Sequence, residues 1–249
     1  MMENRLMKKT GYWQLPCYGN AEVVGILRTN EDLVVTSRVK LFPGLLEYSR
    51  LVDANVEEPS KGYILLVSSK TKELIGTLKM NGTVCSLAFA DDGNRLLSSG
   101  SDGEVYHWDL RMRTCFHKAV DEGCINGMAL CTSPNGRMFA AGSDSGIVNI
   151  YNRDDFLGGK RKPIKTVENL TTKVDFLKFN SDAQILAICS TMKKNSLKLI
   201  HVPLFAVYSN WSPLNKNLHY PWCLDFSPGG GFTAVGKVLL YKLHRYNHA

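Results

Sequence analysis

The sequence predicts an all-β fold made of repeated four-stranded units, that is, a β-propeller or part of one. The first observation is a set of apolar strand ends at intervals of 41, 43, 49 and 41 residues, at Val67, Trp108, Tyr151, Ile200 and Tyr241. A propeller blade has about 40–45 residues. The second is a series of apolar runs, each followed by a turn rich in Asp, Asn, Ser, Pro or Gly, that end at Phe89, Leu130, Phe179 and Phe226. Because both frames agree, we expect propeller blades.

Residues 1–61 do not fit this repeat, and we expect a divergent or weakly ordered N-terminal segment there. AEVVGILRT and EDLVVTSRVKLF are candidate strands, and GLLEYSRLV is a candidate short helix. Residues 62–249 contain the blades: the last two strands of one unit over residues 62–79, then four further units. This makes about four to five blades of a larger ring. Because an incomplete ring leaves open strand edges, we expect a shortened part of a longer protein, or a ring that a partner completes.

The clearest unit runs from Gly82 to Lys118, with strands expected over 84–89, 95–99, 105–108 and 115–118. It contains the WD dipeptide, Trp108 followed by Asp109. A tryptophan packed between neighbouring sheets needs a buried acceptor for its ring N–H group. The residues that we assign to the blade framework are Asp102, Trp108, Asp109, Asp144 and Tyr151.

Asp102 lies in the tight turn SDG, and Asp144 takes the same place in GSDSG of the next unit. Turn stabilisation is the main interpretation of both aspartates, and a ligand role is the alternative. Tyr151 replaces the tryptophan in that unit, and Ile200 replaces it in the following one.

The last unit is shorter than the others. From Phe139 to Tyr151 the chain takes 12 residues, but from Phe232 to Tyr241 it takes 9. We therefore expect a tight hairpin at Gly236 and Lys237, where a slip of one residue would turn the apolar face outward.

The sequence predicts no catalytic, metal-binding or cofactor-binding residues. The six histidines are scattered, and the seven cysteines include no CxxC pair of the kind that zinc sites use. GSDSG has Asp144, not serine, at its centre, so it is not a nucleophile elbow. No HExxH, phosphate-binding or dinucleotide-binding motif is present. We expect neither an enzyme nor a small-molecule substrate, and no apolar run approaches the length needed to cross a membrane.

The chain is basic, with a net charge of +7. The densest cluster lies in the loop FLGGKRKPIK, and a smaller one lies in STMKKNS; together they comprise Lys160, Arg161, Lys162, Lys165, Lys193 and Lys194. These loops are candidates for contact with a partner or with RNA phosphates, which salt would weaken. A solvated loop, or a nuclear-import signal at the first cluster, is the alternative.

Longer phrases are richer than a generic blade pattern. GEVYHWD, VDEG, GIVNIYN and KPIK, in this order, together with ILAICSTMKKNSLKLIHVP, resemble the U3 small nucleolar RNA-associated protein 18 family of WD-repeat proteins. The resemblance covers residues 62–249, about three quarters of the chain. Residues 1–61 do not match the family's longer N-terminal region, so an exosome-recruiting role placed there is not carried over.

This resemblance implies a non-enzymatic scaffold of the small-subunit processome in the nucleolus of the nucleus. The implied partners are other WD-repeat proteins of the UTP-B subcomplex, the U3 small nucleolar ribonucleoprotein and pre-rRNA, and the implied outcome is 18S rRNA maturation. One alternative is a WD-repeat adaptor for another complex, such as a ubiquitin-ligase substrate receptor. A propeller enzyme is a further alternative, but the innermost runs VCSLAF, INGMAL and PWCLDF offer almost no convergent polar side chains.

Overall fold

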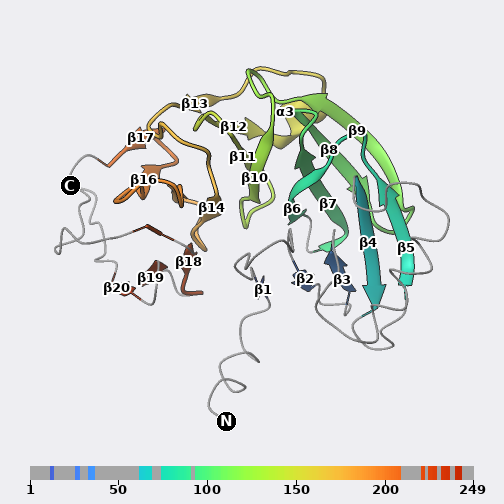
Figure 1. Ribbon diagram of the computed structural model, residues 1–249, viewed down its shortest axis with the longest axis horizontal. Helices are drawn as coiled ribbons and strands as arrows, with labels where there is room; N and C mark the ends of the chain where they lie inside the picture. The colour runs from blue at the N-terminus through green and yellow to red at the C-terminus, as the bar shows by residue number, and fades with distance from the viewer. Residues whose placement is uncertain are drawn as a thin grey trace, which may run out of the picture. The chain divides into compact units, whose positions relative to one another are not determined.

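The computed structural model describes residues 12–13, 26–28, 33–36, 62–68, 74–90, 93–208, 220–221, 224–228, 231–235 and 239–242. These residues form antiparallel sheets with a single short helix, as the predicted partial propeller requires (Figure 1). The chain divides into two compact units, Met1–Lys118 and Ala119–Ala249. The candidate helix GLLEYSRLV lies outside the described residues.

The first unit contains two sheets. Five strands form one sheet in chain order: β1 (Tyr12–Trp13), β2 (Ile26–Arg28), β3 (Leu33–Thr36), β4 (Tyr63–Ser68) and β5 (Leu74–Lys79). Four strands form the other: β6 (Val84–Ala90), β7 (Arg95–Gly100), β8 (Glu104–Asp109) and β9 (Thr114–Val120). The strands predicted over 62–79 and in the WD-containing unit are confirmed. Both candidate strands before residue 61 contain a short strand, and β3 pairs directly with β4.

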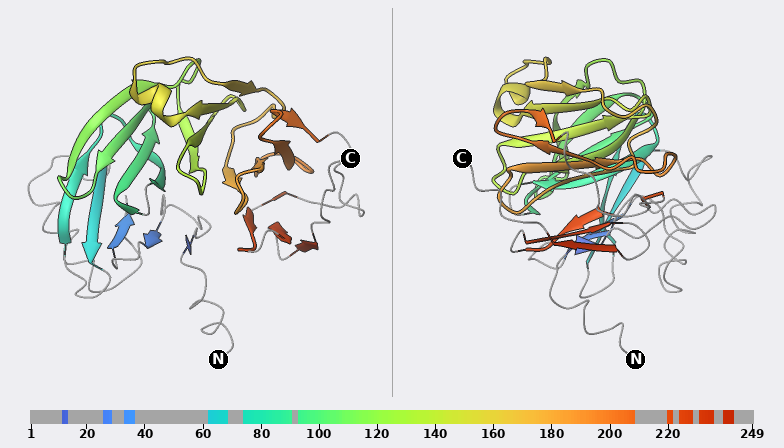
Figure 2. Two further views of the ribbon diagram at one scale, coloured as in Figure 1. Left: turned by 180° about the vertical axis from the view of Figure 1, so that it is seen from behind. Right: turned by 90° about the vertical axis from the view of Figure 1, so that its left-hand side faces the viewer.

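The second unit contains three sheets (Figure 2). The first has β10 (Gly127–Thr132), β11 (Met138–Ser143), β12 (Val148–Asn152) and β13 (Lys165–Val167), with helix α3 (Arg153–Leu157) between the last two strands. The second has β14 (Phe176–Phe179), β15 (Ile185–Cys189), β16 (Lys198–His201) and β17 (Ala206–Val207). The third has β18 (Leu224–Phe226), β19 (Phe232–Val235) and β20 (Leu239–Lys242). The first strands β10, β14 and β18 are neighbours, which is the arrangement of successive blades.

The core of the second unit consists of apolar layers between successive sheets, and β15 shows how the sequence builds them. All five residues of β15 are buried, because side chains alternate between the two faces of a strand. Leu186 and Ile188 pack toward the β10–β13 sheet, whereas Ile185, Ala187 and Cys189 pack toward the β18–β20 sheet. A sheet covered on both faces has continuous apolar strands, which explains the unbroken run ILAIC.

The register of the last hairpin corrects one expectation. Thr233, not Phe232, lies opposite Tyr241, as Leu96 lies opposite Trp108. Thr233 is fully buried, whereas Phe232 is 41% exposed. The preceding hairpin fixes this register, because Phe226 pairs with Thr233 at the same spacing as in the other units. The loop that includes Gly236 and Lys237 lies outside the described residues.

Candidate functional site

The buried tryptophan of the first unit is held by a short chain of polar contacts. The Trp108 Nε1–H group donates to Ser98 Oγ at 2.8 Å, and the Ser98 hydroxyl donates to Met80 Sδ at 3.1 Å. The ring of Trp108 stacks on Tyr106, with 5.6 Å between centroids. The β7 serine therefore supplies the acceptor that a buried indole requires, and the contact fixes β8 against β7.

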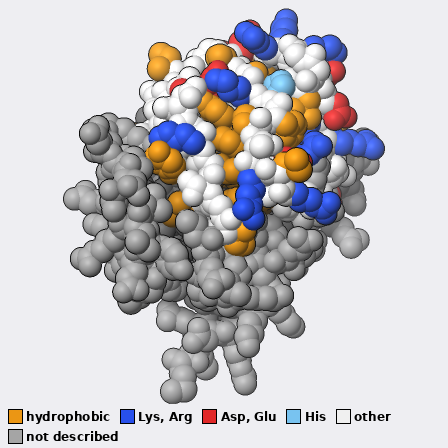
Figure 3. All heavy atoms as spheres, turned by 90° about the vertical axis from the view of Figure 1, so that its right-hand side faces the viewer, with side chains coloured by type: hydrophobic (Ala, Val, Ile, Leu, Met, Phe, Trp, Pro, Cys, Tyr) orange, Lys and Arg blue, Asp and Glu red, His pale blue; other side chains and the backbone are white. Residues whose placement is uncertain are grey.

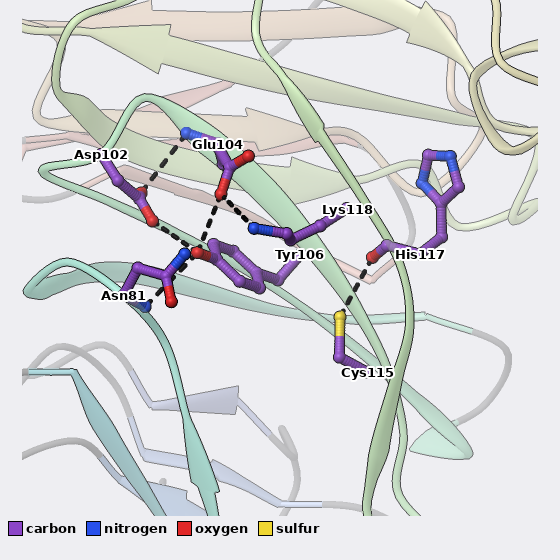
Figure 4. A network of polar contacts seen from close by, with 7 residues as sticks. All are labelled: Asn81, Asp102, Glu104, Tyr106, Cys115, His117 and Lys118. Atoms are coloured by element: carbon purple, nitrogen blue, oxygen red, sulfur yellow. Dashed lines mark hydrogen bonds and ion pairs between the residues drawn. The ribbon is translucent and has the colours of Figure 1, made fainter.

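Asp102 lies in a polar network that closes the turn between β7 and β8 (Figure 4). Its side chain accepts the Tyr106 hydroxyl at 2.6 Å and the backbone N–H of Glu104 at 3.3 Å. Glu104 Oε2 lies 3.0 Å from the same hydroxyl and 3.0 Å from Lys118 Nζ. Burial and the Asp102 carboxylate raise the pKa of Tyr106, so this phenol stays protonated and continues to donate. The aspartate, the glutamate and the tyrosine lie within one turn, and the backbone N–H of Asn81, 25 residues away, also donates to the Tyr106 hydroxyl at 3.4 Å.

Asp144 and Asp109 also hold turns. Asn126 Nδ2 donates to Asp144 Oδ2 at 2.6 Å, which joins the turn after β11 to the segment before β10. Asp109 Oδ1 accepts the backbone N–H groups of Arg111 and Met112, each at 2.9 Å. Asn152 makes the equivalent contacts at the start of α3. Short polar side chains are favoured at such positions because they accept N–H groups that have no other partner.

A second buried network centres on Asp121, which is not among the residues predicted from the sequence. Asp121 is 2% exposed, and its Oδ1 atom accepts the Tyr151 hydroxyl at 2.6 Å and Asn149 Nδ2 at 2.8 Å. Asn149 also donates to the Glu122 carbonyl at 2.8 Å, and Tyr151 Oη accepts the Glu122 N–H at 2.9 Å. Burial raises the pKa of Asp121, and the donated hydrogen bonds act against that rise. Asn149, a buried polar residue in the otherwise apolar start of the strand VNIYN, indicates that a partner is needed but does not identify Asp121 as that partner.

The basic residues form two separate groups in the second unit. Lys160, Arg161, Lys162 and Lys165 are exposed between α3 and the start of β13, and Lys160 pairs with Asp155 at 2.9 Å. Arg161, Lys162 and Lys165 make no ion pair with any described residue.

Lys193 and Lys194 lie in the connection between β15 and β16. Lys193 Nζ donates to Thr171 Oγ1 at 3.1 Å, and Lys194 lies 5.7 Å from the centre of the Tyr220 ring. Consecutive connections of an antiparallel meander leave the sheet at opposite ends. The β12–β13 connection joins the third and fourth strands of its sheet, whereas the β15–β16 connection joins the second and third strands of the next sheet. The two connections therefore leave their sheets at opposite ends, and the two basic groups do not form one surface.

The described residues include no cluster of three or more His, Cys, Asp or Glu side chains placed to hold a metal ion. None of the helices in the same part of the chain is long and apolar enough to span a membrane. The five cysteines with described side chains form no disulfide: Cys85, Cys115, Cys124, Cys131 and Cys189.

Comparison with known proteins finds the repeat, offset by one strand from the sheets: each match takes the last strand of one sheet, β5 or β9, and the first three strands of the next. The family described as WD domain, G-beta repeat matches residues 72–109 and 114–152. Each match ends at the third strand of a sheet, β8 or β12. The repeat period and the dipeptide at Trp108 therefore have a family counterpart.

Three curated relatives that have the same name align with most of this chain. The chain is 67% identical over 194 residues to "U3 small nucleolar RNA-associated protein 18 homolog" of Arabidopsis thaliana, which covers 76% of the chain and 36% of that protein. Identity to the homolog of Homo sapiens is 44% over 192 residues, covering 75% and 34%. Identity to the homolog of Drosophila melanogaster is 35% over 224 residues, covering 85% and 44%. The chain thus spans about a third of the length of the first two relatives.

Proposed function

Because about three quarters of this chain belongs to the family of U3 small nucleolar RNA-associated protein 18, we propose that it is a non-enzymatic WD-repeat scaffold in ribosome biogenesis. Its role is to support U3 small nucleolar RNA-dependent processing of pre-rRNA and the maturation of 18S rRNA, in the nucleolus. The observation that carries the proposal is the high identity to relatives whose names state U3 association. These relatives do not favour a ubiquitin-ligase adaptor.

The geometry supports a scaffold because the polar groups inside the blades serve the blades themselves. Asp102, Asp109, Asp121 and Asp144 all accept hydrogen bonds from their own unit. Stacked sheets with apolar layers between them are rigid, so the connections at their ends are held at fixed positions. In this role the partners are other WD-repeat proteins of the UTP-B subcomplex and the U3 small nucleolar ribonucleoprotein.

The loop after α3 is the part of the second unit best suited to touch RNA. Arg161, Lys162 and Lys165 are exposed cations, while Lys160 is engaged by Asp155. Arginine and lysine bind phosphate oxygens and release counterions from the nucleic acid, which makes binding salt-dependent. Lys193 and Lys194, in the connection between β15 and β16, are candidates for a separate contact with pre-rRNA or a partner.

A charge-reversal experiment tests the RNA contact. The variant R161E/K162E is compared with R111E/R113E, which changes the net charge equally on exposed residues of the other unit. Binding of the purified chain to a fluorescent single-stranded oligouridylate is measured by anisotropy at increasing salt. We expect R161E/K162E to weaken binding and to reduce the slope of log K against log salt by about 1.4, because each lost phosphate contact contributes about 0.7. Equal losses in both variants would contradict a specific contact at this loop.

A further inference from the structure

β9 has the geometry of an open sheet edge. It is the last strand in the order β6-β7-β8-β9, and it has seven residues. The fourth strands of the next two sheets, β13 and β17, have three and two residues. Proteins usually shorten or cover an edge strand, because its backbone groups can pair with another chain. Within the described residues, β9 is neither shortened nor followed by a further strand.

Apolar side chains gather beside this edge. Met112 in the turn before β9 is 72% exposed, and Phe116 within β9 is 43% exposed. Ile75 of β5 is 38% exposed, and the neighbouring Gly76 lies so close to the Arg113 side chain that an added Cβ would be 3.0 Å from its Cδ atom. β5 and β9 lie on the right-hand side of Figure 1, the side that faces the viewer in Figure 3, where apolar atoms are interspersed with Lys and Arg. The edge therefore offers apolar contact area as well as backbone groups.

The charge around β9 is positive. The segment Leu110–Val120, LRMRTCFHKAV, contains Arg111, Arg113 and Lys118 but no carboxylate, and Asp109 directly before it accepts the backbone N–H groups of Arg111 and Met112. The guanidinium of Arg95 lies 4.8 Å from the centre of the Phe116 ring. Glu104 pairs with Lys118, so the turn before β9 has two arginines and one carboxylate, Asp109, and stays positive. This charge is complementary to an acidic partner and repels a basic one.

We propose that the edge of β9 binds an extended, acidic segment of another protein as an additional strand. Backbone pairing with β9 would supply affinity, as in other cases of strand addition. Alternate apolar side chains of the segment would meet Phe116 and Met112, and its carboxylates would meet Arg111 and Arg113. The long edge and exposed apolar side chains favour an extended peptide over RNA, because RNA cannot pair with a strand edge. This surface is distinct from the loop at Arg161, so either can fail alone.

The test uses two acetylated peptides, one alternating Glu and Val and one alternating Lys and Val, with the intact chain. Affinity is measured by fluorescence anisotropy, and hydrogen exchange of residues 111–120 is followed by mass spectrometry. We expect the Glu-Val peptide to bind, to slow exchange in this segment, and to bind at least about tenfold better than the Lys-Val peptide. R111E/R113E should reverse that preference, whereas R161E/K162E should leave it unchanged.

Three outcomes would overturn the proposal. Equal binding of both peptides would show that charge does not select the partner. Binding of the Glu-Val peptide without protection of residues 111–120 would place the peptide elsewhere. Protection of the same segment by the oligouridylate, but by neither peptide, would assign the surface to RNA. Circular dichroism of both variants shows whether they remain folded, and the comparison of the two peptides on the parent chain does not depend on any variant.

Discussion

At the scale of single residues, Asp121 is the most consequential polar group of the second unit. It is buried, and it accepts hydrogen bonds from two side chains of β12, Tyr151 and Asn149. We expect Asp121→Ala to lower the free energy of unfolding by about 1–3 kcal/mol for each donor left buried without an acceptor. Urea denaturation measures the change. Asp182→Asn, at an exposed carboxylate of the same unit, is the control and should have little effect.

Asp121 also makes a specific contribution to the pH dependence of stability. Burial raises its pKa in the folded protein above the value of about 3.9 for a free aspartate. A raised pKa means that the folded state binds the proton more tightly, so this contribution to stability is fully present below the unfolded pKa. It is lost as the pH rises through the folded pKa. Asp121→Asn keeps an acceptor but cannot titrate.

We therefore expect the parent chain to lose stability relative to Asp121→Asn as the pH rises from acid toward neutrality. Unfolding free energies of the two proteins, measured by urea denaturation across that range, give the difference directly. A difference that stays constant with pH, or that shifts in favour of the parent at higher pH, would contradict the raised pKa.

The sequence revealed the need of Trp108 for an acceptor, but not the role of Asp121. An indole N–H requires a partner wherever it is buried, so that requirement follows from residue type alone. The partners of Asp121 lie 28 and 30 residues away, in a strand of otherwise apolar character. A carboxylate in a connecting segment is usually solvated. No local pattern distinguishes this one from its exposed neighbours.

At the scale of elements, two glycines with positive φ allow the energetic cost of backbone conformation to be distinguished from the cost of close packing. Gly123 has φ +72 and open space around it, whereas Gly146 has φ +90 and closely approaches the carbonyl oxygens of Leu170 and Thr172. An added Cβ at Gly146 would lie 2.5 Å from the first and 2.8 Å from the second. Gly123→Ala should cost about 1–2 kcal/mol, the penalty of the left-handed conformation alone.

We expect Gly146→Ala to cost more than Gly123→Ala, because the backbone of the turn must also shift. Thermal denaturation of the two variants checks the order of their stabilities. Equal losses of thermal stability in the two variants would contradict this expectation. They would show that the β11–β12 turn can move away from the segment before β14 without a loss of stability.

Strands were predictable as elements, but their register was not always. The apolar run INGMAL indicated a strand end at Leu130, yet Thr132 takes the place opposite Phe139 that Phe89 takes opposite Leu96. Thr233 similarly replaces the expected Phe232. Threonine is apolar enough on one side to be buried in a strand, so an apolar-run criterion passes over it. Pairing with the neighbouring strand, not residue type, sets the register.

At the scale of the whole molecule, the repeat period revealed the blades, whereas the organisation before residue 62 was hidden. β2 and β3 have three and four residues, and β3 pairs with β4 across the expected domain boundary. Strands this short produce no periodic pattern of their own, and the partner of β3 is distant along the chain. The division at residue 61 stays a prediction, as does the assignment of the basic loops to RNA or protein contacts.

The measurement that most directly tests the proposed scaffold role is affinity purification of the tagged chain from nuclear extract, at low and at high salt. U3 RNA and the proposed partners, WD-repeat proteins of the UTP-B subcomplex, are quantified in the eluate, with R161E/K162E as a matched sample. We expect the subunits and U3 RNA to be recovered together, with recovery retained at high salt where protein contacts dominate. Soluble, folded chain that recovers neither U3 RNA nor these subunits would contradict the role of this chain in a U3-containing assembly.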